Sequence, residues 1–354
     1  MGRRLVIATL AAAGVFAAAC GGGGSSTPTS TTSASSSSSS TSVASSSSGP
    51  STSAAASAPT YPLTGLPVTD EAAAKRPALV VKIDNNALAR PQSNLNAADI
   101  VFEEIVEVQT RFAAVFQSQG TGVVGPIRSG RTQDVMLLGS FNKPLFTWSG
   151  GNPFVTRVIA NSDFVDLSAQ IATVYVGGGF HRDSSRQSPH NLYADLTKLW
   201  SLAPAGAQPP SAQFEHLATG QADTAGTPAS GTRGEMFGLQ VEWTWDAATG
   251  KYGRKSAGVV HSDALNGPLT SENVLVLEVK YGTSAADVHS PEAQTIGNGT
   301  FQLYSRGKLF KGTWTRKDRV STFVLTLADG SPALLTPGRT FVELARPATF
   351  SPES

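Results

Sequence analysis

The sequence of 354 residues contains one cysteine, Cys20, and only three methionines. A single cysteine excludes a disulfide within the chain and a zinc site built on several thiolates, so the folded part has to be stabilised by its hydrophobic core. Charged residues are absent from residues 21–60. In the whole chain 27 basic residues stand against 26 acidic ones. This balance argues against a nucleic acid partner bound through bulk positive charge.

The first twenty residues have the pattern of an export signal. Arg3 and Arg4 precede an uncharged run, residues 5–19, which ends in small residues before Cys20. As a helix this run rises about 22 Å, less than the roughly 30 Å of a membrane core. Residues 17–20 resemble a lipoprotein processing box, in which the cysteine becomes the new N-terminus and its sulfur carries lipid. We predict a signal peptide over 1–20 and lipidation at Cys20; an ordinary secretory signal is the alternative.

Residues 21–60 contain 18 Ser and 7 Thr. Such a composition cannot bury enough apolar area to fold, so we predict a disordered tether with a reach of about 35 Å. Together with the lipid, this predicts an extracytoplasmic protein anchored to the outer face of the cytoplasmic membrane through Cys20.

Composition changes at Tyr61 and again over residues 203–234, which are rich in Ala, Gly, Pro, Gln and Ser. We predict a mixed α/β module over 61–202, a flexible linker or long loop over 203–234, and a mainly antiparallel β module over 235–354. The fold class is therefore α+β or α/β.

In the first module, apolar runs over 78–84, 99–102 and 111–117 predict buried strands. Asn152 before Pro153 predicts a helix start. Ser129 is predicted to cap a second helix that ends at Gly139, and a third is expected from Asn191.

In the second module, residues 239–245 alternate between apolar and polar, which predicts a half-buried strand. Hairpin turns are predicted at 246–250 and at Asp329-Gly330. Residues 273–279 are apolar on both faces and predict a central strand.

Many short motifs occur in order along residues 61–354: Tyr61–Leu66, Ile83–Asn85, Ala89–Ser93, Ala98–Val101, Glu107, Thr110–Phe112, Val124–Ser129, Pro189–Tyr193, Tyr252, Arg254, His261, Asp263 and the strand at Asn273. Together they resemble the YerB-like lipoproteins, a family defined by a domain of unknown function. The resemblance implies a lipoprotein with two structured modules and implies no activity.

Polar residues follow the predicted strands of the first module, where α/β folds usually bind ligands. Arg128 and Arg131 flank Ser129 at the predicted helix start, so two guanidinium groups and free backbone amides are expected to bind one anion, such as phosphate or carboxylate. In the alternative, these arginines pair with nearby carboxylates in a structural ion network. The ligand-binding candidates of this group are Asp84, Asn85, Arg90, Arg111, Arg128 and Arg131.

A pair of carboxylates would be needed for glycoside hydrolysis. Glu103 and Glu104 should point to opposite faces of a strand, and Glu103 and Glu107 should lie about 13 Å apart. A pair made by Asp84 with Glu103 or Glu107 stays open as a weak catalytic hypothesis.

Residues 177–179 are three glycines that follow a predicted strand. Neither the dinucleotide fingerprint nor the phosphate loop is present, and His181, Asp183 and His190 do not have a specific metal-binding spacing, so we predict no cofactor and no metal. We interpret the segment as a loop over the crevice that donates hydrogen bonds to an anionic or sugar ligand; a plain structural loop is the alternative. Its candidate residues are His181, Arg182, Arg186, His190 and Asn191.

These features predict an exported, lipid-anchored binding or scaffold protein of the cell envelope. Its polar crevice would recognise a cell-wall glycan, a peptide or a partner protein. The alternative function is a cell-wall hydrolase that uses Asp84 with Glu103 or Glu107 as acid and base.

Overall fold

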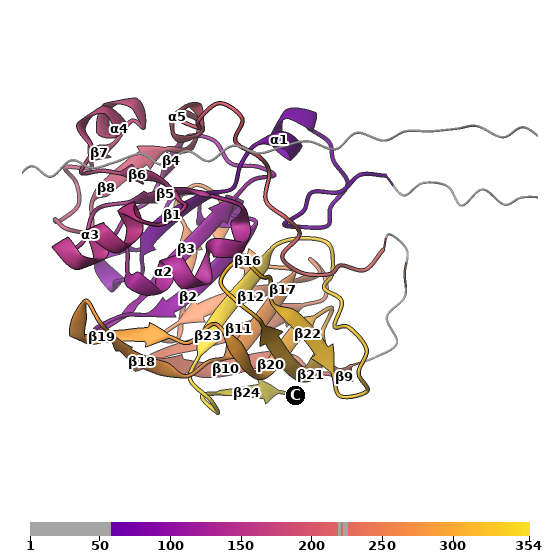
Figure 1. Ribbon diagram of the computed structural model, residues 1–354. Coiled ribbons are helices and arrows are strands. Elements are labelled where there is room, and N and C mark those ends of the chain that lie inside the picture. The colour runs from indigo at the N-terminus through magenta and orange to yellow at the C-terminus, as the bar shows by residue number, and fades with distance from the viewer. Residues whose placement is uncertain (1–57, 219–220, 222–225) are drawn as a thin grey trace, which may run out of the picture. The chain divides into compact units, whose positions relative to one another are not determined.

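The structure is a computed structural model that describes residues 58–218, 221 and 226–354 (Figure 1). The predicted signal peptide, Cys20 and all but the last three residues of the predicted tether lie outside the described residues. Within the described part, no helix has the length and apolar character needed to cross a membrane.

The main sheet has eleven strands and contains strands from both predicted modules. Its order is β22-β21-β20-β17-β23-β2-β3-β1-β5-β6, with β9 also paired to β21. The strands are β22 (Val324–Leu327), β21 (Lys308–Arg316), β20 (Gly297–Ser305), β17 (Asn273–Glu278), β23 (Thr340–Ala345), β2 (Ile100–Ile105), β3 (Thr110–Phe116), β1 (Leu79–Asp84), β5 (Leu145–Trp148), β6 (Val165–Ser168) and β9 (Thr227–Pro228).

The two halves of this sheet meet where β2 pairs in parallel with β23, with Ile100 opposite Thr340 and Glu103 opposite Glu343. Every residue of β1, β2, β3 and β23 is buried. Strands that are covered on both faces need apolar side chains in both directions, which explains their continuous apolar runs. The predicted modules therefore share one sheet inside a compact unit that spans Ala56–Ser354.

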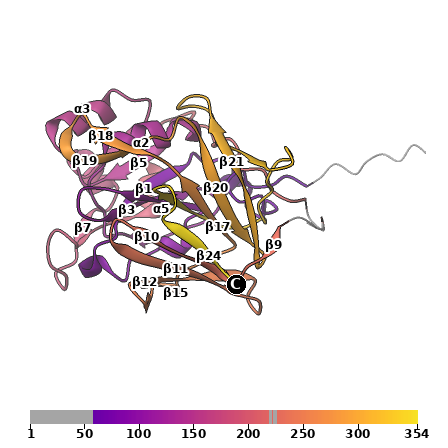
Figure 2. The same cartoon turned by 90° about the horizontal axis from the view of Figure 1, so that it is seen from below.

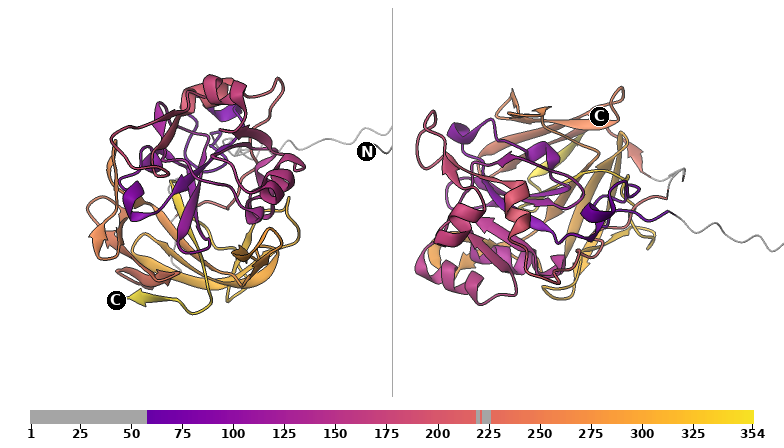
Figure 3. Two further views of the ribbon diagram at one scale, coloured as in Figure 1. Left: turned by 90° about the vertical axis from the view of Figure 1, so that its left-hand side faces the viewer. Right: turned by 90° about the horizontal axis from the view of Figure 1, so that it is seen from above.

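A second sheet, formed by strands between residues 231 and 353, packs against one face of the first (Figures 2 and 3). Its order is β13-β12-β11-β10-β24, with β16 paired to β12. Its strands are β13 (Val259–Val260), β12 (Lys251–Ser256), β11 (Leu239–Asp246), β10 (Gly231–Met236), β24 (Phe350–Glu353) and β16 (Thr270–Ser271).

Short elements surround the two large sheets. The small sheets are β14 (Ser262–Asp263) with β15 (Gly267–Pro268), β18 (Tyr281–Ser284) with β19 (Asp287–Ala293), and β4 (Val123–Val124) with β8 (Leu192–Asp195) and β7 (His181–Arg182). The α-helices are α1 (Glu71–Lys75), α2 (Thr132–Leu137), α3 (Pro153–Ala160), α4 (Ala172–Gly177) and α5 (Leu196–Ser201), and the 3-10 turns are η1 (Ala87–Ala89), η2 (Leu95–Ala97) and η3 (Gly139–Phe141).

Two apolar cores lie on opposite faces of the main sheet. Val81 and Ile83 of β1 point to the core that includes Trp243 and Tyr252 of the second sheet. Val80 points to the core that includes Leu137 of α2 and Ile159 of α3. Because side chains alternate along a strand, the central strands fill both cores.

The predicted strands over 78–84, 99–102, 111–117, 239–245 and 273–279 are confirmed as β1, β2, β3, β11 and β17. The fold class is confirmed as well: a mixed sheet with a few helices forms the N-terminal part, and the C-terminal part is mainly antiparallel. The helix predicted at Asn152 is α3, and the side-chain oxygen of Asn152 accepts a hydrogen bond from the amide of Val155 at 2.9 Å.

Three local predictions are wrong. The helix expected from Ser129 begins at Thr132, because the carboxylate of Asp134 accepts the Arg131 amide at 2.6 Å and forms the cap. Residues 192–195 are strand β8, and α5 starts only after Asp195, whose carboxylate accepts the Lys198 amide. The segment before the three glycines is helix α4, where tertiary context overrides the strand preference of its β-branched residues.

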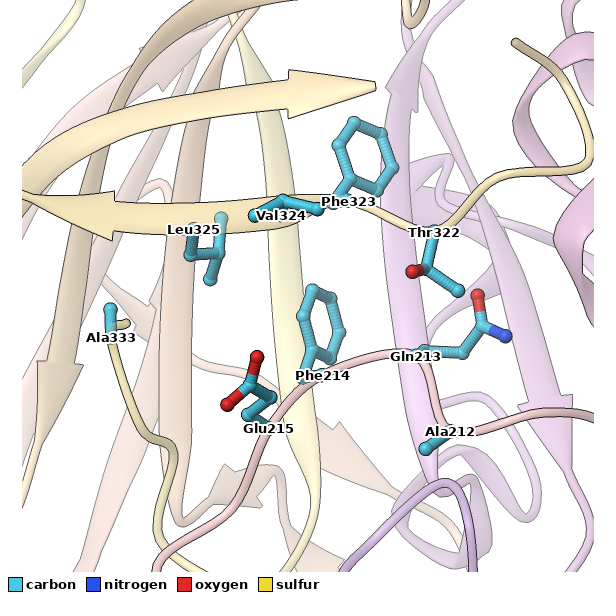
Figure 4. Close-up of a pocket in the computed structure, with 9 residues that line it drawn as sticks. All are labelled: Ala212, Gln213, Phe214, Glu215, Thr322, Phe323, Val324, Leu325 and Ala333. Carbon is cyan, nitrogen blue, oxygen red and sulfur yellow. The ribbon is translucent and has the colours of Figure 1, made fainter. Parts of the chain in front are cut away.

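Part of the segment 203–234 packs on the edge of the main sheet. Leu217 donates its backbone amide to Leu335, and Leu335 donates to Glu215. Phe214 lies beside Phe323 and Leu325 at strand β22, and these side chains line a small cavity of about 110 Å³ (Figure 4). Residues 212–217 are therefore an ordered strap over this edge of the sheet.

Candidate functional site

A polar crevice lies at the carboxyl ends of the parallel strands β5 and β6. Residues 149–152 connect β5 to α3, and Gln170 follows β6. The cavity has a volume of about 400 Å³. This is the position at which open α/β sheets usually bind ligands. Its lining residues are Glu107, Ser129, Arg131, Ser149, Gly150, Gly151, Asn152, Val155, Gln170, Ser284, Ala286, Asp287 and Ser290.

The loop between β5 and α3 requires glycine. Gly150 has φ +115°, and a Cβ on it would lie 2.5 Å from Nε2 of Gln170. At this φ a residue with a Cβ is strained, and the Gln170 side chain would also have to move. Glycine therefore suits the point where the β5–α3 loop meets Gln170.

The opposite wall comes from the C-terminal segment, through the hairpin of β18 and β19. Asn152 donates its side-chain amide to the carbonyl of Ala286 at 3.2 Å. The hydroxyls of Ser284 and Thr132 lie 2.7 Å apart, and the Ser290 hydroxyl donates to Oε1 of Glu107. Residues 134 to 183 positions apart in the sequence thus form one cavity.

Arg131 meets Glu107 at the rim of the crevice. Its Nε and Nη2 atoms donate to the two carboxylate oxygens of Glu107 at 2.7 and 2.6 Å. Partial burial alone would raise the pKa of Glu107, but the hydrogen bonds from Arg131 and Ser290 and the charge of Arg131 lower it to about 2. Both side chains remain partly exposed, at 15% for Arg131 and 25% for Glu107.

Arg128 pairs with Asp84 at the end of β1. Nε of Arg128 lies 3.1 Å from Oδ2 of Asp84, and Nδ1 of His190 lies 2.7 Å from the same oxygen. Because a carboxylate only accepts, the proton of His190 lies on Nδ1. Asp84 also accepts the backbone amide of Asn86. In this structure Arg128 and Arg131 thus each lie against a carboxylate, Asp84 and Glu107 respectively.

Arg111 lies behind these pairs and is almost fully buried. Its Nη1 atom donates to the carbonyl of Ser129 at 2.9 Å, and among the described residues its Nε atom has no acceptor. Burial lowers the pKa of Arg111, and the charges of Arg131 and Arg128 add to this.

Glu103 belongs to a different cluster, on the other face of the sheet. Its carboxylate accepts from Asn85 at 2.9 Å, from Thr110 at 2.6 Å and from Arg254. Arg90 in turn donates to the side-chain oxygen of Asn85. Asn85, Arg90 and Glu103 therefore do not line the crevice, and none of them is brought to Asp84 by a direct side-chain contact.

Arg254 is buried between Glu103 and Glu343, with its Nε 3.7 Å from Oε1 of Glu343. It also donates to Nδ1 of His261, so the proton of that ring lies on Nε2, which donates to Gln92 at 2.8 Å. Burial, followed by the charge of Arg254, keeps the pKa of His261 well below its usual value. Burial and the charge of Glu103 raise the pKa of Glu343.

Glu104 points to the opposite face from Glu103, as alternation along the strand predicts. Nζ of Lys82 lies 2.7 Å from Glu104 and 2.8 Å from Asp134, and all three side chains are fully buried. Burial, and then the charge of Asp134, raises the pKa of Glu104 to about 7. This cluster fixes α2 on the sheet beside the crevice.

Three residues of the predicted ligand loop, His181, Arg182 and Arg186, line another hollow of about 420 Å³, whereas His190 and Asn191 do not. Arg182 donates to Asn191, and Asn191 donates to the carbonyls of Asp183 and Arg186. Arg186 donates to the carbonyls of Ala89 and Pro91. These hydrogen bonds hold the loop in place, and they separate Arg182 from the crevice that it was expected to line.

Among the residues that the structure describes, no group of three or more His, Cys, Asp or Glu side chains is arranged to hold a metal ion.

Several lining residues were not found by sequence reasoning. Ser149 and Gly150 carried a usable signal, because a Ser-Gly-Gly-Asn-Pro segment joins a strand to a capped helix start. Ser284, Asp287 and Ser290 carried none, because only the tertiary fold brings the β18–β19 hairpin to the crevice.

The chain is an α+β protein with a mixed sheet shared by its N- and C-terminal segments, a second β-sheet, and a crevice that both segments line. Two family models match the chain: the N-terminal domain of a protein of unknown function, DUF3048, over residues 63–208, and the C-terminal domain of the same family over 235–342. The chain belongs to this family.

A similar curated protein is "Putative lipoprotein YerB" of Bacillus subtilis (strain 168), 28% identical over 293 residues, which are 80% of this chain and 85% of the relative. The crystal structure of YerB protein from Bacillus subtilis superposes with a TM-score of 0.72 at 25% identity. That match covers 83% of this chain and 99% of the other.

Proposed function

We propose that this protein is a lipid-anchored, extracytoplasmic binding protein whose crevice holds a polar ligand of the cell envelope. The observation that carries the proposal is the cavity of about 400 Å³ at the ends of β5 and β6, where Arg131, serine hydroxyls and the start of α3 meet. Similarity to a protein named as a lipoprotein, together with the signal pattern before Cys20, supports the location. A glycan, a peptide and a partner protein each contain groups that such donors bind.

The contacts of the carboxylates favour binding over hydrolysis. Asp84 is fully buried and paired with Arg128 and His190. Glu103 is also fully buried, and it lies on the opposite face of the sheet from Asp84, as the register with Arg111 and Phe112 requires. Glu107 is held by Arg131. A glycosidase acid needs access to the scissile bond, which Asp84 and Glu103 lack. Glu107 does line the crevice, but neither of the other two carboxylates is accessible there to act with it.

The test is capture of wall material by the immobilised full-length protein. Wild type should retain peptidoglycan fragments or a wall-associated polymer, and Arg131→Ala should reduce retention at least tenfold. Arg233→Ala is the matched control, because Arg233 is an exposed arginine of the second sheet that also pairs with glutamates. Equal retention by Arg131→Ala and wild type would refute the crevice as the binding site.

The hydrolase alternative makes a separate prediction. Incubation with wall material should then release soluble fragments, and Asp84→Asn should stop the release without loss of binding. Retention without any released product would exclude this alternative.

A further inference from the structure

The crevice already binds one carboxylate, which is that of Glu107. Three donor atoms from two parts of the chain converge on it: Nε and Nη2 of Arg131, and the hydroxyl of Ser290. The two bonds from Arg131 run to the two different oxygens, which is the planar, two-pronged geometry of a guanidinium with a carboxylate. The donor set therefore already holds a carboxylate in a favourable geometry.

Glu107 lies in a position from which its side chain can leave. It is in the four-residue turn between β2 and β3, where the Val106 amide donates to the carbonyl of Gln109 at 2.9 Å. The next residue, Val108, is 82% exposed. The backbone bond holds the turn without help from the Glu107 side chain. A change of rotamer at Glu107 would release Arg131 and Ser290 without a change in the backbone.

The crevice adds further hydrogen-bonding groups around the same donors. Ser129 and Ser149 have their hydroxyl oxygens 3.5 Å apart on the adjoining wall. Gln170 lines the same cavity. A ligand that places its acid group on Arg131 would therefore meet polar groups along its length.

We infer that the ligand bears a carboxylate, and that Glu107 competes with it for Arg131 and Ser290. This inference rests on the proposed function. A peptide C-terminus and a uronic acid share the required chemistry. Because Glu107 occupies the donors, the apparent Kd of the ligand equals its intrinsic Kd divided by the fraction of molecules in which Arg131 is released.

The experiment measures binding of two carboxylates to the full-length protein by titration calorimetry: N-acetyl-dialanine for the peptide source and methyl glucuronide for the sugar source. Glu107→Gln and Glu107→Ala should bind at least one of them about tenfold more tightly than wild type. That gain corresponds to a Glu107 contact that holds Arg131 in about nine molecules of ten. Adding Arg131→Ala to Glu107→Gln should abolish the gain.

The controls separate this competition from a general effect of charge. The amide of N-acetyl-dialanine should show no gain with Glu107→Gln, because it lacks the anionic group that Arg131 would bind. Glu71→Gln, which removes an exposed glutamate of α1 paired with Lys75, should bind like wild type.

Two results would overturn the inference: affinity for both carboxylates that is unchanged or lower in both Glu107 variants, or an equal gain for the amide. If Arg131-dependent capture of wall material persists in that case, the proposed function stands and only the carboxylate assignment fails. If that capture is absent as well, both fail.

Discussion

Replacing Arg254 with methionine tests the buried cluster that joins the two sheets. Arg254 is fully buried, and its guanidinium contacts Glu103 of β2, the Ser256 hydroxyl and Nδ1 of His261. Arg254→Met keeps much of the side-chain volume but leaves Glu103 and Glu343 buried opposite each other without a cation. Removing one partner of a buried ion pair costs about 3–5 kcal/mol, a large part of the 5–15 kcal/mol that stabilises an ordinary domain.

The two carboxyl groups of this cluster should respond differently. Oε2 of Glu343 has no hydrogen-bond partner among the described residues, whereas Oε1 accepts from Trp243 at 2.9 Å. Glu343→Gln retains that acceptor and replaces an acid whose pKa is already raised by burial and by Glu103, so we expect a change of less than about 1 kcal/mol. Glu103→Gln in the Arg254→Met background should recover part of the loss, because it removes one of the two unpaired acids.

The assay is unfolding in urea at pH 7, monitored through the change in tryptophan fluorescence. Arg233→Met is the control on the second sheet, and an exposed arginine should change the free energy of unfolding by less than about 0.5 kcal/mol. A loss below about 1 kcal/mol for Arg254→Met would refute the reasoning, because the cluster would then contribute little to joining the sheets.

Two further predictions concern pH and anchorage. The pKa of Glu104 is raised to about 7 in the folded protein, so its contribution to stability is complete below about pH 4.5 and is lost as pH rises toward 7. The free energy of unfolding should therefore fall between pH 4.5 and pH 7, by at most about 1.4 kcal/mol per pH unit from this group. Glu104→Gln should flatten the fall, as measured by urea titrations at the two pH values. An equally steep fall in the variant would contradict the assignment. Cys20→Ser should move the protein from the membrane fraction and abolish incorporation of labelled palmitate, whereas unchanged palmitate labelling would exclude lipidation at this cysteine.

The family resemblance and the main strands could be read from the sequence. Apolar runs such as residues 78–84 predict strands because a run this short is typical of an extended chain that is buried on both faces. Asn152 before Pro153 predicted a helix start because capping depends on neighbouring residues alone. The opposite directions of Glu103 and Glu104 followed from strand geometry.

The tertiary structure alone decided which charges are free. Arg128 and Arg131 have the same sequence context whether they bind a ligand or a carboxylate, and their partners Asp84 and Glu107 were two among several candidates. The pairing of β2 with β23 joins the predicted modules in one sheet, and the β18–β19 hairpin completes the crevice. Contacts between residues far apart in the sequence depend on the packing of whole sheets, and local spacing carries no record of it.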